Sequence, residues 1–438
     1  MIDGGWPLRP SLTTVCALLL ALTPVALAQE AEPGQESQAD TPPGDDLGPS
    51  EDELEAIRAA LEADTALIEA ERPSPPPAPA LAPASPAVGS RLASSGGLAN
   101  PDIALILDTA GAWFSTPDNL QTGAHDPGRT GFNLQQLEMS LGASVDPFFR
   151  MDANIVFAQF GVEVEEAYAT TLSFPANLQV RAGQFLTRFG RLNPTHPHSW
   201  SFADQPIISG KFFGGEGNRG LGAEISWLSP LPWYVELVAS ATDAAGACCA
   251  RSYFGAEDLG VLTPLDMLTT VSLKQFFALS DDLSLMWGVT AQQGPNASGN
   301  GNRTEIYGTD LYLRYRPVAS PKRDSLSLTV EAMVRRRQLP GLLLVDGGLY
   351  SQLVWKMNLR WETGCRYEWV TGTQDDPLDP LWTSHRQRAS GQLTFYPSHF
   401  SRLRLQGNYD VPTWRDEPII AGFLALEVLI GAHGAHTY

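Results

Sequence analysis

Strict alternation of polar and apolar residues is the feature that most limits what this chain can form. Segment 402–410 has Arg, Arg, Gln, Asn and Asp at its even positions and Leu, Leu, Gly and Tyr at its odd positions, and segments 310–316, 326–331, 358–362 and 366–369 repeat the pattern. Neighbouring side chains on a strand point to opposite faces, so each segment predicts a strand with one wet and one apolar face. Repeated over many strands, this pattern indicates an all-β transmembrane barrel, with lipid outside and water inside.

The beginning of the chain predicts export. Arg9 precedes an apolar stretch, 15–28, which ends on an Ala-Leu-Ala cleavage site. Pro24 interrupts the stretch, and no later segment approaches the roughly 20 consecutive apolar residues that a membrane helix needs. We therefore expect a signal peptide over 1–28 and a closed barrel in the outer membrane of a Gram-negative cell.

Residues 29–99 have the composition of a disordered tail. Segment 29–72 holds 14 Asp and Glu residues against two Arg residues, and no aromatic residue. A Ser-x-x-Glu capping box and apolar residues at helical spacing predict a short helix over 50–72, either a coiled-coil stub or a solvated helix. A Pro/Ala-rich linker over 73–88 follows it. We expect this tail to lie in the periplasm.

Residues 100–438 are expected to form the barrel. About sixteen strands are predicted, and 14 to 18 fit the same boundaries. They begin near Ile103, Phe132, Met151, Val162, Leu178, Gly220, Trp233, Leu265, Leu283, Thr304, Leu326, Leu342, Asn358, Arg386, Arg402 and Ile419. The even-numbered connections are short turns, whereas several odd-numbered ones are long and polar, which is typical of outer-membrane barrels with both termini in the periplasm. The longest, 187–217, is rich in Pro and apolar residues, so we expect it to fold into the lumen and form the narrowest point.

The end of the chain and the predicted location in the outer membrane indicate which partners to expect. The sequence closes on an aromatic residue, Tyr438, which is the usual mark of a substrate of the barrel-assembly machinery. We expect outer-membrane lipid and the barrel-assembly machinery as partners, and no nucleic acid. A homotrimer is the assembly that we keep as a candidate. No nucleophile elbow, P-loop, zincin motif or dinucleotide fingerprint stands in a suitable context, so no enzymatic activity is expected.

The water-facing sides of the later predicted strands are rich in arginine. By the parity of the alternation, the residues expected to line the pore are Arg314, Arg335, Arg337, Arg360, Arg366, Arg386, Arg388, Arg402 and Arg404. Clustered cations raise the local concentration of anions, which predicts a channel that prefers anions. Alternatively they pair with lumen carboxylates without giving selectivity, for example with Glu331, Glu362, Glu368 and Asp410. Parity identifies the face of a side chain but not its neighbour, so both interpretations stay open.

Histidine and cysteine residues suggest two local features. His196 and His198 lie in the longest loop and are candidate zinc ligands, since imidazole is a good ligand for zinc; a loop histidine held by backbone hydrogen bonds is the alternative. Zinc is the one cofactor that these residues suggest. The adjacent Cys248 and Cys249 form either a vicinal disulfide or free or intermolecularly paired thiols, and Cys365 shares the parity of the lipid-facing residues.

Three pieces of the chain carry a resemblance to a known group. Segments 132–149, 181–198 and 431–436 resemble outer-membrane proteins labelled zinc-regulated TonB-dependent outer membrane receptors, and more distantly the phosphate-selective porins. The length of the barrel segment predicts the porin class. A porin-like channel for passive diffusion of small solutes is therefore the leading interpretation. The resemblance implies a second interpretation, a metal-related uptake protein in which His196 and His198 are capture ligands and Asp204 or Glu216 is a further ligand. The third interpretation is a structural protein that tethers the outer membrane to the cell wall.

Overall fold

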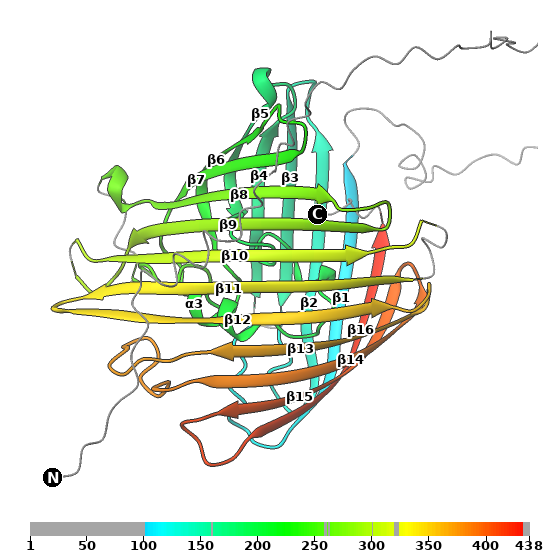
Figure 1. Cartoon of the computed structure of the whole chain (residues 1–438), viewed down its shortest axis with the longest axis vertical. Coiled ribbons are helices and arrows are strands. Elements are labelled where there is room, and N and C mark those ends of the chain that lie inside the picture. Colours follow the sequence, from blue (N-terminus) through cyan, green and yellow to red (C-terminus); the bar gives the residue numbers. More distant parts are fainter. Residues whose placement is uncertain are drawn as a thin grey trace, which may run out of the picture. The chain divides into compact units, whose positions relative to one another are not determined.

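A closed antiparallel barrel of sixteen strands makes up the described part of the chain (Figure 1). A computed structural model describes residues 101–158, 161–257, 261, 263–299, 301–318 and 324–431. Each strand pairs with its neighbours in sequence, and β1 pairs with β16 to close the barrel. The predicted fold class is confirmed. The predicted signal peptide, tail helix and linker lie outside the described residues.

The strands and the helix have the following bounds. The first eight strands are β1 (Asp102–Phe114), β2 (Gly131–Ser144), β3 (Phe149–Ala158), β4 (Gly161–Thr171), β5 (Leu178–Leu186), β6 (Arg219–Leu228), β7 (Tyr234–Thr242) and β8 (Leu268–Ala278). The other eight are β9 (Leu283–Pro295), β10 (Arg303–Tyr315), β11 (Ser325–Leu339), β12 (Leu342–Lys356), β13 (Trp361–Val370), β14 (Arg386–Ser398), β15 (Ser401–Pro412) and β16 (Ile419–Gly431). A short helix, α3 (Ile207–Phe213), lies between β5 and β6. None of the helices in the described ranges has the length and apolar composition to cross a membrane.

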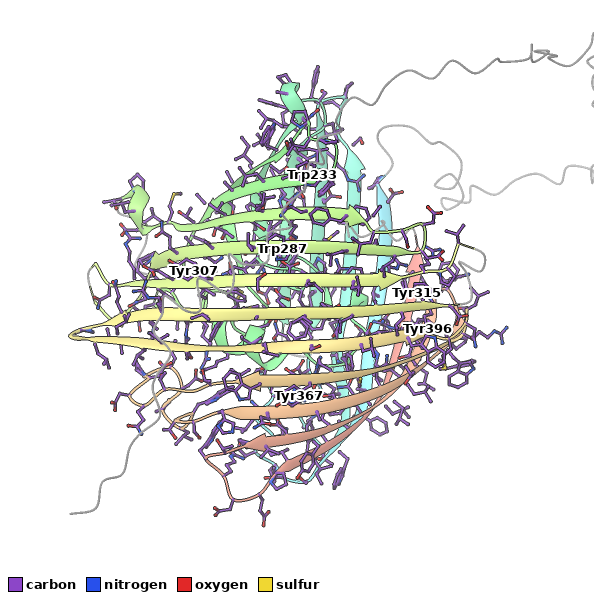
Figure 2. All side chains as sticks on the ribbon, in the orientation of Figure 1. Trp233, Trp287, Tyr307, Tyr315, Tyr367 and Tyr396 are labelled. Carbon is purple, nitrogen blue, oxygen red and sulfur yellow. A yellow bond between two sulfur atoms is a disulfide. The ribbon has the colours of Figure 1, made fainter. Side chains whose placement is uncertain are left out.

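The predicted alternation holds along the wall. On β15, Arg404 and Gln406 are buried inside the barrel, whereas Leu405 and Tyr409 are exposed on its outer surface. On β10, Tyr307 and Tyr315 are exposed eight residues apart (Figure 2), and Leu residues lie between them on the same face. Eight residues of strand span roughly 26 Å. This outer surface has the apolar band and flanking aromatic residues of a lipid-facing barrel.

The long loops 115–130, 187–218, 243–267 and 371–385 lie at one end of the barrel, and short turns such as 145–148, 279–282 and 399–400 lie at the other. The short-turn end also contains the start of β1 and the end of β16. Every predicted strand start lies within three residues of an observed one. The prediction is wrong for Arg360, because Asn358 accepts hydrogen bonds from the backbone N–H groups of Arg360 and Trp361 and so forms a turn before β13. Arg360 is exposed in that turn and is not on the inner wall.

Candidate functional site

The loop between β5 and β6, residues 187–218, crosses the inside of the barrel. At one point His196 contacts Glu165 on β4. At another, the backbone N–H of Ile207 donates to Glu368 on β13, on the far side of the ring of strands. In Figure 1, α3 lies behind the strands of the near wall, and every residue of this helix is buried. The prediction that the loop folds into the lumen is confirmed. That it forms the narrowest point stays a prediction.

An apolar core holds α3 in place. Ile207, Phe212 and Phe213 belong to a buried cluster that also contains Tyr253 from the β7–β8 loop and Tyr350 from β12. Apolar residues buried inside a porin-like barrel stabilise a loop by the same hydrophobic effect that stabilises a soluble core. The loop is therefore a packed part of the structure.

Asp204 is the most highly connected side chain of the loop. It is fully buried and accepts hydrogen bonds from Arg366 at 2.6 Å, from Arg388 at 3.0 Å, and from Gln406 and Asn408 at 2.7 Å each. Burial raises the pKa of this carboxyl, but the two guanidinium groups and the hydrogen bonds outweigh burial, and the pKa is lowered. Asp204 is therefore an ionised anchor between the loop and β13–β15. It does not lie beside His196, where the sequence offered it as a third zinc ligand.

A second charged network anchors α3. Lys211 contacts Asp346 at 2.6 Å, and Arg335 contacts the same carboxylate at 2.7 Å. Arg335 also contacts Asp376 in the β13–β14 loop at 2.9 Å, and Asp376 accepts from Arg337 at 3.0 Å. Two loops and the inner wall of β11 and β12 are thereby joined by charge-assisted hydrogen bonds.

Most of the predicted pore-lining arginines are neutralised by carboxylates. Six of them form ion pairs: Arg335, Arg337, Arg366, Arg386, Arg388 and Arg402. Arg404 is buried and donates to the backbone carbonyl of Trp200, and Arg314 is half-buried on β10. Of the predicted partners, Glu368 pairs with Arg366, and Asp410 pairs with Arg386 and Arg388. Glu331 and Glu362 instead accept hydrogen bonds from Tyr350 and Gln392. For these six residues, the pairing interpretation describes the wall better than free cations do.

Two β-bulges, one on β2 and one on β4, direct extra polar side chains into the lumen. The pairing of β3 with β4 shifts at Asn154 and Ile155, which face Glu166 and Val164, so Glu165 is the extra residue. Glu165 and Glu166 are adjacent in sequence and both buried. The pairing of β1 with β2 shifts in the same way at Gln135. Bulges of this kind re-aim side chains and occur next to functional sites.

The bulges border a buried group of histidines and glutamates. His196 Nδ1 lies 3.1 Å from Glu165 Oε2 and 3.7 Å from Glu138 Oε1, and its Nε2 lies 2.9 Å from Glu166 Oε2. The rings of His196 and His198 stack with centroids 5.7 Å apart, and His198 Nδ1 lies 2.9 Å from Glu138 Oε2. The structure therefore brings the two predicted histidines together, with carboxylates beside both rings.

A third histidine, which the sequence did not single out, completes the group. His125 in the β1–β2 loop contacts Glu216 at 2.8 Å. Burial opposes protonation of His125, but the hydrogen bond and the charge of Glu216 outweigh burial and raise its pKa to about 9. Burial likewise opposes protonation of His196, whereas Glu165 and Glu138 raise its pKa well above the usual value. Without another cation, both rings are therefore held as imidazolium ions by the carboxylates.

Two recesses open on opposite sides of the loop. The inner recess, towards the short-turn end, has an empty volume of about 1040 Å³ and is lined by Arg191, Lys274, Tyr312 and Arg366, among others. The outer recess, among the long loops, has an empty volume of about 750 Å³ and is lined by Arg251, Asp379, Arg386 and others. Neither Arg191 nor Lys274 forms an ion pair with any described residue, and the Arg191 guanidinium lies 3.7 Å from the centre of the Tyr312 ring.

The structure shows the bonding state of Cys248 and Cys249 and the face on which Cys365 lies. Cys248 and Cys249 form a vicinal disulfide in the β7–β8 loop. Their backbone carbonyls accept hydrogen bonds from Glu216 and Arg219, so this loop packs against the end of the β5–β6 loop. Cys365 is a free, exposed residue on the outer face of β13, as its parity predicts.

Comparisons with known proteins identify the barrel type and a relative. No family model matches the sequence. The outer membrane channel DcaP of Acinetobacter baumannii has a TM-score of 0.52 and 12% identity, over 76% of this chain and 97% of that one. OprB of Pseudomonas putida has a TM-score of 0.51 and 11% identity, over 75% and 94%. These likenesses show the fold of an outer-membrane porin barrel and do not support the label of a zinc-regulated TonB-dependent receptor.

One relative is close in sequence. A protein of Aquifex aeolicus (strain VF5), described as uncharacterized, is 33% identical over an alignment of 384 residues that covers 77% of this chain and 80% of that protein. The match is too long to be confined to a single motif, and it must include most of the barrel. The chain belongs to the same family as this Aquifex aeolicus protein.

Proposed function

We propose that this protein is an outer-membrane channel for passive diffusion of small solutes, with a preference for anions. The observation that carries the proposal is a closed sixteen-strand barrel whose inner face is polar, with two cations beside its inner recess, Arg191 and Lys274, that form no ion pair with a described residue. A barrel of this strand number is wide enough for an aqueous lumen. The short-turn end and the N-terminal tail are assigned to the periplasm, as in other barrels of this topology.

The route we propose passes from the outer recess to the inner recess along the β5–β6 loop. The apolar core around α3 and the Asp204 anchor fix the loop between them. A rigid loop of this kind limits the size of the solute and keeps charged side chains at fixed positions along its route.

Anion preference rests on Arg191 and Lys274 and not on the six parity-identified arginines that form ion pairs. An ion pair presents little net charge to a passing ion, whereas an unpaired cation attracts anions. At a separation of about 6 Å in water, one unit charge contributes roughly 0.7 kcal/mol, or about a threefold change in local ion concentration at low salt. Two such charges therefore raise the local concentration of anions about tenfold and lower that of cations by a similar factor.

Planar-bilayer recording of the purified full chain tests both parts of the proposal. We expect discrete conductance steps, and a reversal potential in a KCl gradient that has the sign for chloride permeation. Changing Arg191→Gln and Lys274→Gln together should lower the chloride-to-potassium permeability ratio by at least roughly tenfold at low salt, because the local concentrations of both ions change. Arg336→Gln is the matched control, because Arg336 pairs with Glu305 outside the lumen. Absence of conductance in correctly folded protein would refute the channel, and an unchanged ratio in the double variant would refute the selectivity.

A further inference from the structure

We propose that a divalent transition-metal ion binds in the lumen at the His–Glu cluster, which we define as His125, Glu138, Glu165, His196 and Glu216. The cluster contains two sets of ligand atoms that share Glu165. The first set is Glu138, Glu165 and His196, and the second is His125, Glu165 and Glu216. Within each set all ligand atoms lie within 4.8 Å of one another.

The distances in the first set suit a small tetrahedral ion. His196 Nδ1 lies 3.1 Å from Glu165 Oε2 and 3.7 Å from Glu138 Oε1. Ligand atoms at about 2.1 Å from a tetrahedral zinc ion are roughly 3.4 Å apart, which lies between these two values. The second set already has His125 Nε2 and Glu216 Oε2 at 2.8 Å, so binding requires a separation of this pair by a few tenths of an ångström. Two carboxylates in each set balance the charge of a divalent cation.

Each imidazole is also supported on its other nitrogen. His196 Nε2 can donate to Glu166 Oε2 at 2.9 Å while Nδ1 faces the cluster. His125 Nδ1 lies 3.4 Å from the backbone carbonyl of Gln135, the bulged residue of β2, while Nε2 faces Glu216. Metal-binding histidines usually donate their second ring N–H to a carboxylate or a backbone carbonyl, which fixes the tautomer and the ring orientation. Glu166 and Gln135 occupy these supporting positions.

A separate observation points to a ligand at the same place. Gln205 is 3% exposed, and its Oε1 has no hydrogen-bond partner among the described residues. Gln205 lines a cavity with an empty volume of about 340 Å³ together with His125, Glu165 and Glu216. A buried amide oxygen without a partner costs free energy, and a metal ion or its bound water satisfies it.

The ligand types select the class of ion. Imidazole with carboxylates suits zinc or manganese, whereas Mg²⁺ and Ca²⁺ prefer oxygen ligands alone and Cu(I) prefers sulfur. Another group, Glu163 with Cys248 and Cys249, has suitable spacing but its sulfurs are joined in the disulfide and cannot act as thiolates. Only the His–Glu cluster is therefore assigned as a metal site.

A bound ion would join the loops to the wall. His125 belongs to the β1–β2 loop, and His196 and Glu216 belong to the β5–β6 loop, whereas Glu138 and Glu165 are part of β2 and β4. An ion in the first set therefore joins the β5–β6 loop to β2 and β4, and an ion in the second set joins both loops to β4. Metal binding does not depend on the proposed channel, and its test measures no current, so the two proposals fail separately.

Zinc binding by the full chain tests the inference. The purified protein in detergent is stripped with a chelator and titrated with Zn²⁺ in competition with a chromophoric chelator, with excess Mg²⁺ present. We expect saturable binding, and a loss of at least tenfold in affinity for Glu165→Gln, because Glu165 belongs to both sets. Glu362→Gln is the matched control, since Glu362 is a buried inner-wall carboxylate that accepts hydrogen bonds from Gln392 and Tyr396.

The outcomes separate a built site from surface binding. Heat-modified migration on gels shows whether each variant folds. If Glu165→Gln fails to fold, the single variants His125→Gln and His196→Gln replace it, and each should weaken binding at its own set. Saturable binding in the wild-type protein and Glu362→Gln, with loss in the cluster variants, supports the site. No saturable binding by the wild-type protein, or equal affinity in wild-type and cluster variants, would overturn it.

Discussion

Replacing Asp204 by Asn should release the β5–β6 loop while the barrel stays folded. The change conserves shape but removes the charge that faces Arg366 and Arg388, and it turns one acceptor oxygen into a donor opposite two donors. Removing one partner of a buried ion pair costs about 3–5 kcal/mol. Arg366 retains Glu368 at 2.9 Å and Arg388 retains Asp410 at 3.0 Å, so we expect the lower end, about 3 kcal/mol. Such a change shifts the equilibrium between docked and released loop by roughly 150-fold.

Amide hydrogen exchange measured by mass spectrometry reports this equilibrium directly. The backbone N–H groups of Ala203, Gln205 and Ile207 each donate to a side chain outside the loop, namely Gln406, Asp126 and Glu368. Peptides covering 201–209 should exchange about two orders of magnitude faster in Asp204→Asn, whereas strand peptides should not change.

The matched control for this experiment is Asp118→Asn. Asp118 also pairs with an arginine, Arg415, but at the rim, where its side chain is 71% exposed. Exposed ion pairs contribute little to stability, so exchange in 201–209 should be that of the wild type. If Asp204→Asn folds and its loop exchanges at the wild-type rate, the anchor role is refuted.

Two further changes test the wall and the tail. Leu405→Arg puts a charge on an outward side chain that is 58% exposed in the middle of β15, and should lower the free energy of unfolding in bilayers by about 2–4 kcal/mol near the midplane; Leu405→Met should have little effect, and equal stability of the two variants would contradict the face assignment. Deleting 29–95 should leave insertion intact, because the closed barrel begins at Asp102 and pairs β1 with β16; a truncated chain that no longer shows heat-modified migration, when the full chain does, would contradict this.

The fold was predictable because strand parity is a local property of the sequence. A residue on a regular strand has its face fixed by its position, whatever its partners are. Arg386 and Arg388 were thus correctly placed on the inner wall, and Leu405 and Tyr409 on the outer one. Arg360 was misplaced because Asn358 forms a turn with its own side chain, and this local hydrogen bonding overrides the alternation.

The partners of the inner side chains were not predictable in this way. Asp204 and Arg388 are far apart in sequence and meet only because the loop crosses the lumen. The sequence analysis did not identify Arg191 and Lys274 as pore-lining cations, because Arg191 lies in a loop and Lys274 is a single lysine on β8. Charge on the inner face can be read from parity, but whether that charge is neutralised depends on contacts between distant segments.

The His–Glu cluster shows where a parity argument must fail. Glu165 and Glu166 are neighbours in sequence, so a regular strand would send one of them to lipid, and an ionised carboxylate there would be unstable. The bulge in β4 allows both to face the lumen, and the bulge at Gln135 in β2 places a backbone carbonyl behind His125. Two adjacent carboxylates in a barrel strand are therefore themselves a signal, since the chain can keep both away from lipid only by breaking the alternation. In this protein the break occurs beside His125, His196 and Glu138, where the added carboxylate gives the two ligand sets the member that they share.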